Sequence, residues 1–466
     1  MTTEDRAWAW EEFRSAKLGD ARLKSRLLRM ATRVAQRPSG LIATVFKEPA
    51  ERQAAYDFLS NDAVRAEQVT AAAATAALER CRDKSVIYVP IDGSSITLSD
   101  PSKTKRLGSI GARKFPTRGL QVMTALAVEE DGTPAGLVDL RAWVRPPKSR
   151  ESRFRRRAQR KTEMQHLTDT VDAVLARIPA ASAWVVIDRG GDESFTLQQL
   201  ASSGASFTVR AAQNRVVEHR GKSRKLFSVA RSGKLLATRS LELGATEKRK
   251  ARTAVVEVRA AETTLLLPTS KGSKKRVALN VGVVEIREVG NRRDKVSWVL
   301  LTNHPVTAID NVDRVVRSYR FRWRIEEYYR GWKRGGCNVE DIQLRSVEGI
   351  RKWATLLGSM AARAERLKYL ARTQPDAPAT IELSEVEIRA LVIAKRQIKT
   401  SVEQVPDGIP TIEKATLWIA DLGGYAGHYK KGRRPGTTTI SRGLEDLAIW
   451  TAARIAFETE QKSGGR

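Results

Sequence analysis

Two short apolar segments that each end on an aspartate constrain the fold of this chain most. Residues 86–91 lead into Asp92, and residues 183–187 lead into Asp188. Continuous apolar runs of this length, rich in valine and isoleucine, are typical of strands buried on both faces. An acid that closes such a strand either serves a functional site or caps the turn that follows it, and the sequence leaves both interpretations open for each aspartate.

The segments around these two runs predict an α/β protein. Residues 120–128 and 137–144 predict two strands joined by a turn at 129–134, and residues 162–178 predict a helix. Asp192 then predicts the cap of a helix that reaches about Ser202. The order of three strands, a helix, a strand and a helix resembles the RNase H-like fold of the retroviral integrase superfamily. That resemblance implies that the first and fourth strands are neighbours, which would bring Asp92 and Asp188 together.

A second group of strands is predicted between Asp188 and residue 301. The segments are 207–210, 253–259, 263–267, 277–288 and 297–301, with basic turns at 222–225 and 248–252. We interpret them as a β-strand insertion, at about 207–301, within a catalytic domain of residues 71–372. Helical regions flank that domain at 1–70 and 373–466. In the second of these, Ser384 and Glu387 predict a capping box, after a linker at 374–378.

A helix predicted at residues 21–36 carries two parallel stripes. Its apolar stripe is Leu23, Leu27, Met30 and Val34. Its basic stripe is displaced from the first by one residue, which is about 100° around a helix, and consists of Arg22, Arg26, Arg29 and Arg33. A helix seated on a core with arginines along its flank can lie against DNA, so we predict a helical DNA-binding domain over residues 1–70. The alternative is a solvated basic face.

Residues 319–333 are the most informative segment for chemistry. Read as one helix, this segment places one carboxylate on the same face as three cations and a phenol. The residues of that face are Tyr319, Arg322, Glu326, Arg330 and Lys333. A single acid among phosphate-binding groups is typical of a metal-dependent site that cuts nucleic acid. The alternative is a helix covered in exposed ion pairs.

The charge of the chain indicates a polyanionic partner. Its 466 residues include 83 Lys and Arg against 53 Asp and Glu, a formal net charge of +30. Such an excess costs self-repulsion, and polyphosphate is the partner most able to offset it. Cys81 and Cys337 are isolated and no zinc-ligand spacing occurs, so we expect a reducing cytoplasm and no structural zinc. We also expect no membrane span, since no apolar run approaches about 18 residues.

Asp92, Asp188 and Glu326 are the predicted catalytic and metal-binding residues. They lie far apart in the sequence, so only folding can assemble them. Three carboxylates can hold two divalent ions about 3.5–4 Å apart, one activating the attacking oxygen and one stabilising the leaving oxygen of a phosphoryl transfer. Oxygen ligands without Cys or His favour Mg²⁺, with Mn²⁺ as a substitute.

The spacing of Tyr319, Arg322, Glu326 and Lys333 matches the YREK signature of DDE transposases in the insertion-sequence-four family. Further segments resemble that family throughout the chain, around residues 18–22, 53–59, 91–95, 187–189 and 297–302. The resemblance implies a bacterial, nucleoid-associated enzyme that cuts an insertion sequence from DNA and inserts it elsewhere. It also implies hairpin formation and resolution at the cut ends, followed by strand transfer into target DNA.

The resemblance also assigns roles to DNA-binding residues. Trp298 would stack on a base flipped from the element's end, and Arg210 would contact DNA. Tyr319, Arg322, Arg330 and Lys333 would position the terminal phosphates. The double-stranded DNA bound would be the terminal inverted repeats and the target, and catalysis would occur in a homodimer joined largely by the C-terminal region.

Two further points remain open from the sequence. The segment 145–161 holds nine cations and is either a solvated loop or a track for DNA phosphates. The activity has two alternatives: a catalytically silent DNA-binding relative, and a non-specific RNase H-like nuclease. The presence of all three acids disfavours the first, and the long terminal regions disfavour the second.

Overall fold

A computed structural model describes residues 8–111, 117–145, 162–243, 252–270, 273–290, 295–397, 405, 408–427 and 434–464. The chain forms two compact units, each built from several stretches of sequence. The first contains residues 1–83, 93–160 and 324–466, and the second contains 84–92 and 161–323. The predicted domain boundaries at 70 and 372 stay a prediction, as do those of the β insertion.

The second unit is organised around a mixed sheet. Its strand order is β1-β5-β6-β12-β11-β10-β7-β8, with β9 paired to β10. β1 pairs with β5 in parallel, as predicted for the first and fourth strands, and β5 pairs in parallel with β6. The bounds are β1 Ile87–Thr97, β5 Ala183–Ile187, β6 Ser206–Arg210, β7 Val216–His219, β8 Lys222–Lys225, β9 Lys234–Leu243, β10 Arg252–Pro268, β11 Arg276–Glu288 and β12 Ser297–Thr302.

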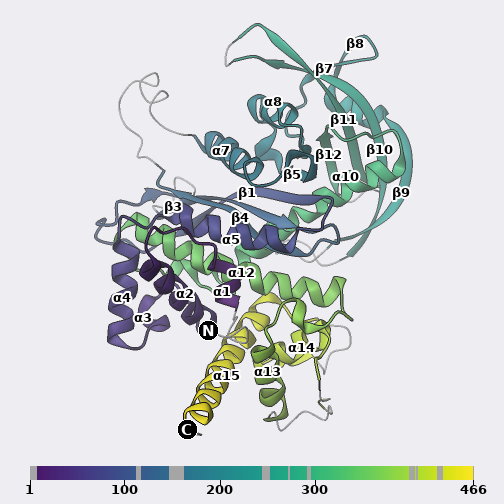
Figure 1. Cartoon of the computed structure of the whole chain (residues 1–466). Helices are drawn as coiled ribbons and strands as arrows, with labels where there is room; N and C mark the ends of the chain where they lie inside the picture. Colours follow the sequence, from purple (N-terminus) through teal and green to yellow (C-terminus); the bar gives the residue numbers. More distant parts are fainter. Residues whose placement is uncertain are drawn as a thin grey trace. The chain divides into compact units, whose positions relative to one another are not determined.

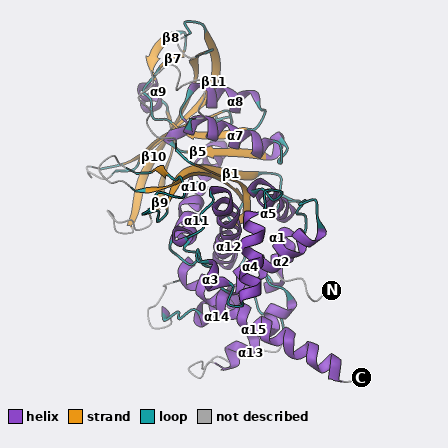
Figure 2. Ribbon diagram, turned by 90° about the vertical axis from the view of Figure 1, so that its left-hand side faces the viewer, coloured by secondary structure: helices purple, strands orange, loops and turns teal. Residues whose placement is uncertain are grey.

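Four helices accompany this sheet, and aromatic side chains fill its interior. The helices are α7 Glu163–Leu175, α8 Ser194–Ser202, α9 Leu226–Ser232 and α10 Ile309–Phe321, and α8 lies beside α7 (Figure 2). Trp184 is fully buried on β5, and its ring centre lies 5.4 Å from that of Tyr88 on β1. The Trp184 indole donates to the hydroxyl of Thr208 at 2.9 Å, so its one polar atom is satisfied.

Several strand predictions for this unit were wrong in detail. β10 is one strand where two were predicted, because Ala260 and Ala261 keep their ladder partners on β11. Lys222–Lys225 is the strand β8, and was predicted as a turn. β8 is an edge strand whose four side chains are all exposed. Its sequence therefore lacks the alternation of apolar and polar residues that predicts a half-buried strand. β7, β8, β9 and α9 were all missed; most of the predicted turn at 248–252 lies outside the described residues.

In the first unit, helices pack against a two-stranded hairpin. The hairpin predicted from the sequence is thereby confirmed. The hairpin is β3 Arg118–Val128 and β4 Pro134–Trp143, and α5 lies along β4 (Figure 1). The short strand β2 Gly108–Ser109 pairs with β3. The helices are α1 Trp8–Phe13, α2 Ala21–Gln36, α3 Ile42–Val45, α4 Pro49–Ser60, α5 Ala66–Arg80, α11 Trp323–Lys333, α12 Val347–Thr373, α13 Glu385–Gln397, α14 Ile412–Leu422 and α15 Thr437–Gly464.

Predicted helix signals in this unit are confirmed at several ends. On α2, Leu27, Met30 and Val34 are buried as the stripe predicts. At the start of α13, the Ser384 N–H donates to Glu387 at 2.9 Å and the Glu387 N–H donates back to the Ser384 hydroxyl at 3.4 Å. This reciprocal pair is the predicted capping box.

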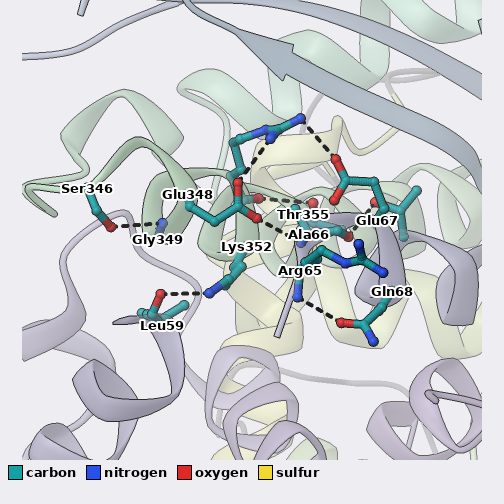
Figure 3. A network of polar contacts seen from close by, with 12 residues as sticks. Leu59, Arg65, Ala66, Glu67, Gln68, Ser346, Glu348, Gly349, Lys352 and Thr355 are labelled. Carbon is teal, nitrogen blue, oxygen red and sulfur yellow. Dashed lines mark hydrogen bonds and ion pairs between the residues drawn. The ribbon is translucent and has the colours of Figure 1, made fainter. Parts of the chain in front are cut away.

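Helix α12 is the centre of the first unit. Nearly every residue from Gly349 to Leu370 is buried, including Lys352, whose side chain is 1% exposed. The Lys352 ammonium donates to the carbonyl oxygens of Leu59 at 3.0 Å and Asn61 at 2.8 Å (Figure 3). These carbonyls lie at and just beyond the C-terminal end of α4, where a cation is electrostatically favourable. Lys352 therefore joins α12 to the N-terminal helices.

No helix in the described parts of the chain combines the length and the apolar character needed to cross a membrane.

Replacing Lys352 with methionine tests whether this buried cation joins the helices. Met keeps the apolar stem but leaves the two carbonyl oxygens without their donor, so the free energy of unfolding should fall by about 1–3 kcal/mol. Chemical denaturation measures the change. The exposed Lys17→Met is the control and should leave stability within about 0.5 kcal/mol. Equal stability of the two variants would show that Lys352 is not a structural contact.

Candidate active site

The two predicted aspartates lie directly after the paired segments of two neighbouring parallel strands, at the same register. Ile91 on β1 is paired with Ile187 on β5, so Asp92 and Asp188 are the next residues on each strand. β1 was predicted to end at Asp92 but continues to Thr97, which places Asp92 inside the strand. Asp188 ends β5 and accepts the Gly190 N–H at 2.7 Å. It therefore caps the turn, which leaves its second carboxylate oxygen for a separate role.

Arg322 forms an ion pair with Asp92. A guanidinium nitrogen lies 3.0 Å from the Asp92 carboxylate, and the two side chains are 12% and 17% exposed. An ion pair so largely removed from water is held more firmly than a surface pair. This contact joins β1 to residues 319–333. No sequence pattern alone could establish that connection.

Three more predicted residues lie next to this pair in the second unit. The Tyr319 ring centre is 5.9 Å from the Arg322 guanidinium and 5.2 Å from the Trp298 ring, which it meets edge-on. Trp298 is half-buried and Tyr319 is buried. Arg210 is half-buried on the adjacent strand and donates to the Ser297 carbonyl at 3.1 Å. The structure thus gathers cations and aromatic rings beside Asp92.

Residues 319–333 were predicted as one helix, but they are divided between two helices. α10 ends at Phe321, Arg322 is its C-terminal cap and α11 begins at Trp323. The Arg322 side chain is engaged by Asp92, and the division between the two units falls directly after Trp323. Sequence reasoning also passed over Trp323, whose side chain is 44% exposed and lies 5.8 Å from the Arg322 guanidinium. A tryptophan between two arginines in this aromatic-rich segment was the sequence signal that could have identified Trp323 as a candidate site residue.

Asp192 was predicted as a helix cap, and that prediction was wrong. Glu193 caps α8 instead, accepting the N–H groups of Phe195 and Thr196. Asp192 is buried and accepts the N–H groups of Ala212 at 2.7 Å and Gln213 at 2.8 Å, and it also pairs with Arg215. Its carboxylate is therefore saturated by donors from the segment after β6.

Asp192 therefore connects two loops near the candidate site, a role that the sequence did not reveal. It ties the loop after β5, which begins at Asp188, to the loop after β6, which begins beyond Arg210. Three charge-assisted or backbone hydrogen bonds on one buried carboxylate fix the two loops together. Because its partners lie 20 or more residues away, only the fold could identify them.

Within the first unit, α11 carries the other predicted site residues. Glu326 is half-buried and Arg330 is exposed. The Lys333 ammonium donates to the Ser94 hydroxyl at 2.7 Å, on the part of β1 that follows Asp92. Burial lowers the pKa of Lys333 despite the opposing effect of Glu340. This lysine is thus held against β1 from the helix that bears Glu326.

A buried polar network holds α11 in place. Arg324 donates to the Gly132 carbonyl and to the Tyr369 hydroxyl, both at 2.8 Å. Tyr369 donates in turn to Glu327 at 2.5 Å, and Lys368 lies 3.3 Å from the same carboxylate. The neighbour of Glu326 therefore anchors the helix to α12, which fixes the direction in which Glu326 projects.

Helix α15 closes the network from the other side. The Thr437 hydroxyl donates to Glu365 at 2.5 Å and accepts from Lys368 at 3.1 Å. Gly331 on α11 permits this approach, because a Cβ atom there would lie 3.1 Å from the Thr437 methyl group. The first residue of α15 is thus in direct contact with the helix that carries Glu326.

The metal prediction has partial chemical support. Two carboxylates on neighbouring strands form an oxygen-donor pair that suits Mg²⁺ or Mn²⁺. Over the residues that the structure describes, no three His, Cys, Asp or Glu side chains are gathered so as to hold a metal ion. The Asp92, Asp188 and Glu326 triad therefore stays a prediction.

Two other DNA-binding predictions have different outcomes. On α2, Arg22 pairs with Asp20 at 3.2 Å and Arg33 pairs with Glu51 at 2.6 Å, whereas Arg29 is exposed and Arg26 is partly exposed. The stripe therefore faces solvent, with its two ends in ion pairs. In the basic segment 145–161, Arg145 is exposed and residues 146–161 lie outside the described residues.

Comparison with protein families connects this geometry to a known activity. Residues 5–64 match the transposase DNA-binding family, and residues 153–362 match the transposase DDE domain. These two matched segments make the chain similar to transposases in a DNA-binding region and in a DDE region. Asp188 and Glu326 lie within the range matched to the DDE domain, and Asp92 precedes it. Both matches support DNA as a partner of this chain.

Replacing Lys368 with methionine tests the network that supports α11. Burial alone would raise the pKa of Glu327, but Lys368, Tyr369 and Arg324 together lower it, while burial raises the pKa of Glu365. Without Lys368 the buried Glu365 loses its cation and faces Glu327, which keeps Tyr369 and Arg324, and the free energy of unfolding at neutral pH should fall by about 3–5 kcal/mol.

The pH dependence distinguishes this cause from a simple loss of packing. Removing the cation raises the pKa of both carboxyl groups, so acid neutralises them and the stability deficit of Lys368→Met should shrink as the pH falls. Denaturation midpoints from neutral to acid pH measure the deficit, with the exposed Lys414→Met as control. A deficit that does not change with pH would contradict the proposed ion-pair origin.

Proposed function

We propose that this chain is a cut-and-paste DNA transposase of the insertion-sequence-four family, active through Asp92, Asp188 and Glu326. The observation that carries the proposal is the shared register of Asp92 and Asp188, with Arg322 paired to Asp92 at 3.0 Å. A phosphate bound by this guanidinium lies within reach of the carboxylates. Nucleic-acid cutting needs this combination of cation and acids.

An RNase H-like catalytic core is supported by the strand arrangement. In the second unit, β1, β5 and β6 are parallel neighbours, and the two aspartates come directly after the paired segments of β1 and β5. In the first unit, the remainder of β1 is next to β3 in the strand order, and β3 pairs with β4 in an antiparallel hairpin. The pairing of the first and fourth predicted strands, β1 and β5, is the feature that the resemblance to the RNase H-like fold implied.

The proposed residue roles follow from the contacts described above. Asp92, Asp188 and Glu326 would hold two Mg²⁺ ions, which would supply activation of the attacking oxygen and stabilisation of the leaving oxygen. Arg322 and Lys333, each held against β1 in its own unit, would position the terminal phosphate. Tyr319 and Arg330 would complete that contact, and Trp298 with Arg210 would steady the distorted DNA end.

The proposed reaction has four phosphoryl transfers in sequence. Water attacks the phosphodiester at the element's end and releases a 3′-hydroxyl on the element. This hydroxyl attacks the opposite strand, forming a hairpin and releasing the flanking DNA. A second water opens the hairpin, and the regenerated 3′-hydroxyl attacks a phosphodiester of the target.

A homodimer in the DNA complex completes the proposal. Helix α15 exposes four large apolar side chains along its second half, a surface suited to contact with a second copy of the chain. These residues are Ile449, Trp450, Ile455 and Phe457. The α2 arginines would contact the terminal inverted repeats. We place this DNA-bound assembly at the nucleoid, in the bacterial cytoplasm.

Cleavage of the element's own ends tests the proposal directly. Purified protein incubated with a duplex carrying those ends should give nicks and hairpins on a denaturing gel, only when Mg²⁺ or Mn²⁺ is added. Asp92→Asn, Asp188→Asn and Glu326→Gln should each lower the cleavage rate by on the order of a thousandfold or more, because each removes an acid from the chemical step. The exposed Asp83→Asn should cleave normally.

Other outcomes would assign a different activity. DNA that is retarded but never cut would indicate a silent DNA-binding relative. Cleavage that does not depend on the end sequence would indicate a non-specific nuclease. Cut ends without any trapped hairpin would remove the hairpin step while keeping the transposase assignment.

Trp298 tests the proposed contact with a flipped base. Trp298→Ala should weaken binding to a duplex with an unpaired base near its end by about 1–3 kcal/mol, the usual value of one base stacked on an aromatic ring. Trp298→Phe should keep most of the affinity, since it retains an aromatic face beside Tyr319. Dissociation constants from fluorescence anisotropy measure both variants. Equal affinities of Trp298→Ala and the unmodified protein would exclude the stacking role.

A further inference from the structure

The hairpin formed by β7 and β8 borders a hollow in the second unit that the proposed chemistry does not use. The hairpin lies at the end of the strand order, next to α9 (Figure 2). The hollow has a volume of about 820 Å³ and lies between this hairpin, α9, the start of β9 and the middle of β10.

Cations dominate the lining of this hollow. Arg220, Lys222, Arg224 and Lys234 line it, against the single acid Glu262. All four cations are exposed, and none forms an ion pair with another residue in the described part of the chain. Elsewhere many arginines are paired with acids, as Arg215 is with Asp192. The hollow therefore presents a positive charge that the chain itself does not neutralise.

The strand geometry concentrates this charge on one side. Lys222 and Arg224 are two residues apart on β8, so their side chains leave the same face of the strand about 6–7 Å from each other. Ser228 and Ser232 on α9 add hydroxyl groups to the same lining. Spaced cations with neighbouring hydroxyls are typical of contacts to successive phosphates.

The turn of the hairpin supports a functional interpretation. Arg220 and Gly221 connect the strands with φ values of 52° and 70°. A two-residue turn of this type favours Asn or Gly at its first position, and a larger side chain in the left-handed region costs about 1–2 kcal/mol. An arginine stands at that position nonetheless. A strained residue that adds charge to a charged hollow points to binding.

We propose that this hollow binds the phosphate backbone of DNA outside the catalytic centre. The inference rests on the proposed function for the source of the DNA. Within the second unit, β8 and β1 are the two ends of the strand order, with six strands between them. At about 4.8 Å per strand, the separation of β8 from β1 across the sheet is roughly 35 Å, or about ten base pairs of duplex.

An alternative role for the same cations is protection of the sheet edge. Charged residues on an edge strand prevent pairing with the edge of another molecule. That role requires only that β8 carry charge. It makes no prediction about the salt dependence of DNA binding, so the two roles give different results.

Salt titration of DNA affinity tests the proposal. The triple variant Lys222→Gln/Arg224→Gln/Lys234→Gln and the unmodified full chain are compared without Mg²⁺, so that no cutting occurs. The matched control Lys274→Gln/Lys275→Gln/Arg276→Gln removes the same charge from exposed positions at the β10–β11 turn. Removing one cation that binds a phosphate should reduce the slope of log affinity against log salt by about 0.9.

Duplex length supplies the second readout. On duplexes that extend well beyond about ten base pairs on both sides of the cut site, the slope of the triple variant should be lower by two to three than that of the control. On duplexes trimmed close to the cut site the two variants should be equal. The reduction should be the same for specific and scrambled sequences, because phosphate contacts carry no sequence information.

Each result supports or overturns the hollow as a DNA site. Equal slopes for the triple variant and its control on long duplexes would overturn it. Self-association of the triple variant with an unchanged slope would overturn it in favour of edge protection. Because binding is measured without catalysis, failure of the unmodified chain to cut its ends would refute the proposed function and leave this result interpretable.

Discussion

Parallel pairing of β1 with β5 is the constraint on which the candidate chemistry depends. The side chains of paired parallel strands are in fixed register, so pairing Ile91 with Ile187 also decides where Asp92 and Asp188 lie. The paired parts of both strands are buried, so a change of register would misplace apolar side chains that are closely packed. The hydrophobic core of the second unit therefore enforces the placement of two acids that contribute nothing to it.

In the first unit, several charged side chains are buried and paired with one another. Arg363 and Arg366 on α12 are almost fully buried and pair with Glu387 at 2.8 Å and Glu129 at 2.6 Å. Desolvating such ions costs several kcal/mol each, and a hydrophobic pair is often equally stable. Such ionic contacts favour one geometry, because each guanidinium donates its hydrogen bonds in its own plane. Polar contacts of this kind join α12 to the hairpin, to α13 and, through Lys368, to the helix bearing Glu326.

The sequence predicted those features that depend on local pattern. The buried strands, the β3–β4 hairpin, the α2 stripe and the Ser384–Glu387 capping box follow from apolar periodicity and turn chemistry within a few residues. Features that depend on distant partners were missed. Asp192 has the local appearance of a helix cap, yet its donors come from the segment after β6. Likewise the helical periodicity of 319–333 is real, but it gives no sign that the helix breaks at Arg322.

The distribution of paired charge explains why a strongly basic chain can still fold. With 83 cations and 53 acids, some acids pair with cations at positions where burial makes an unpaired ion costly, as at Asp192, Glu327 and Glu382. The surplus is then left at exposed positions, where water screens repulsion at little cost. Exposed cations at Arg29 and on β8 belong to this surplus. Folding thus sorts the charges, so that acids neutralise the buried cations and the surplus cations stay in contact with solvent.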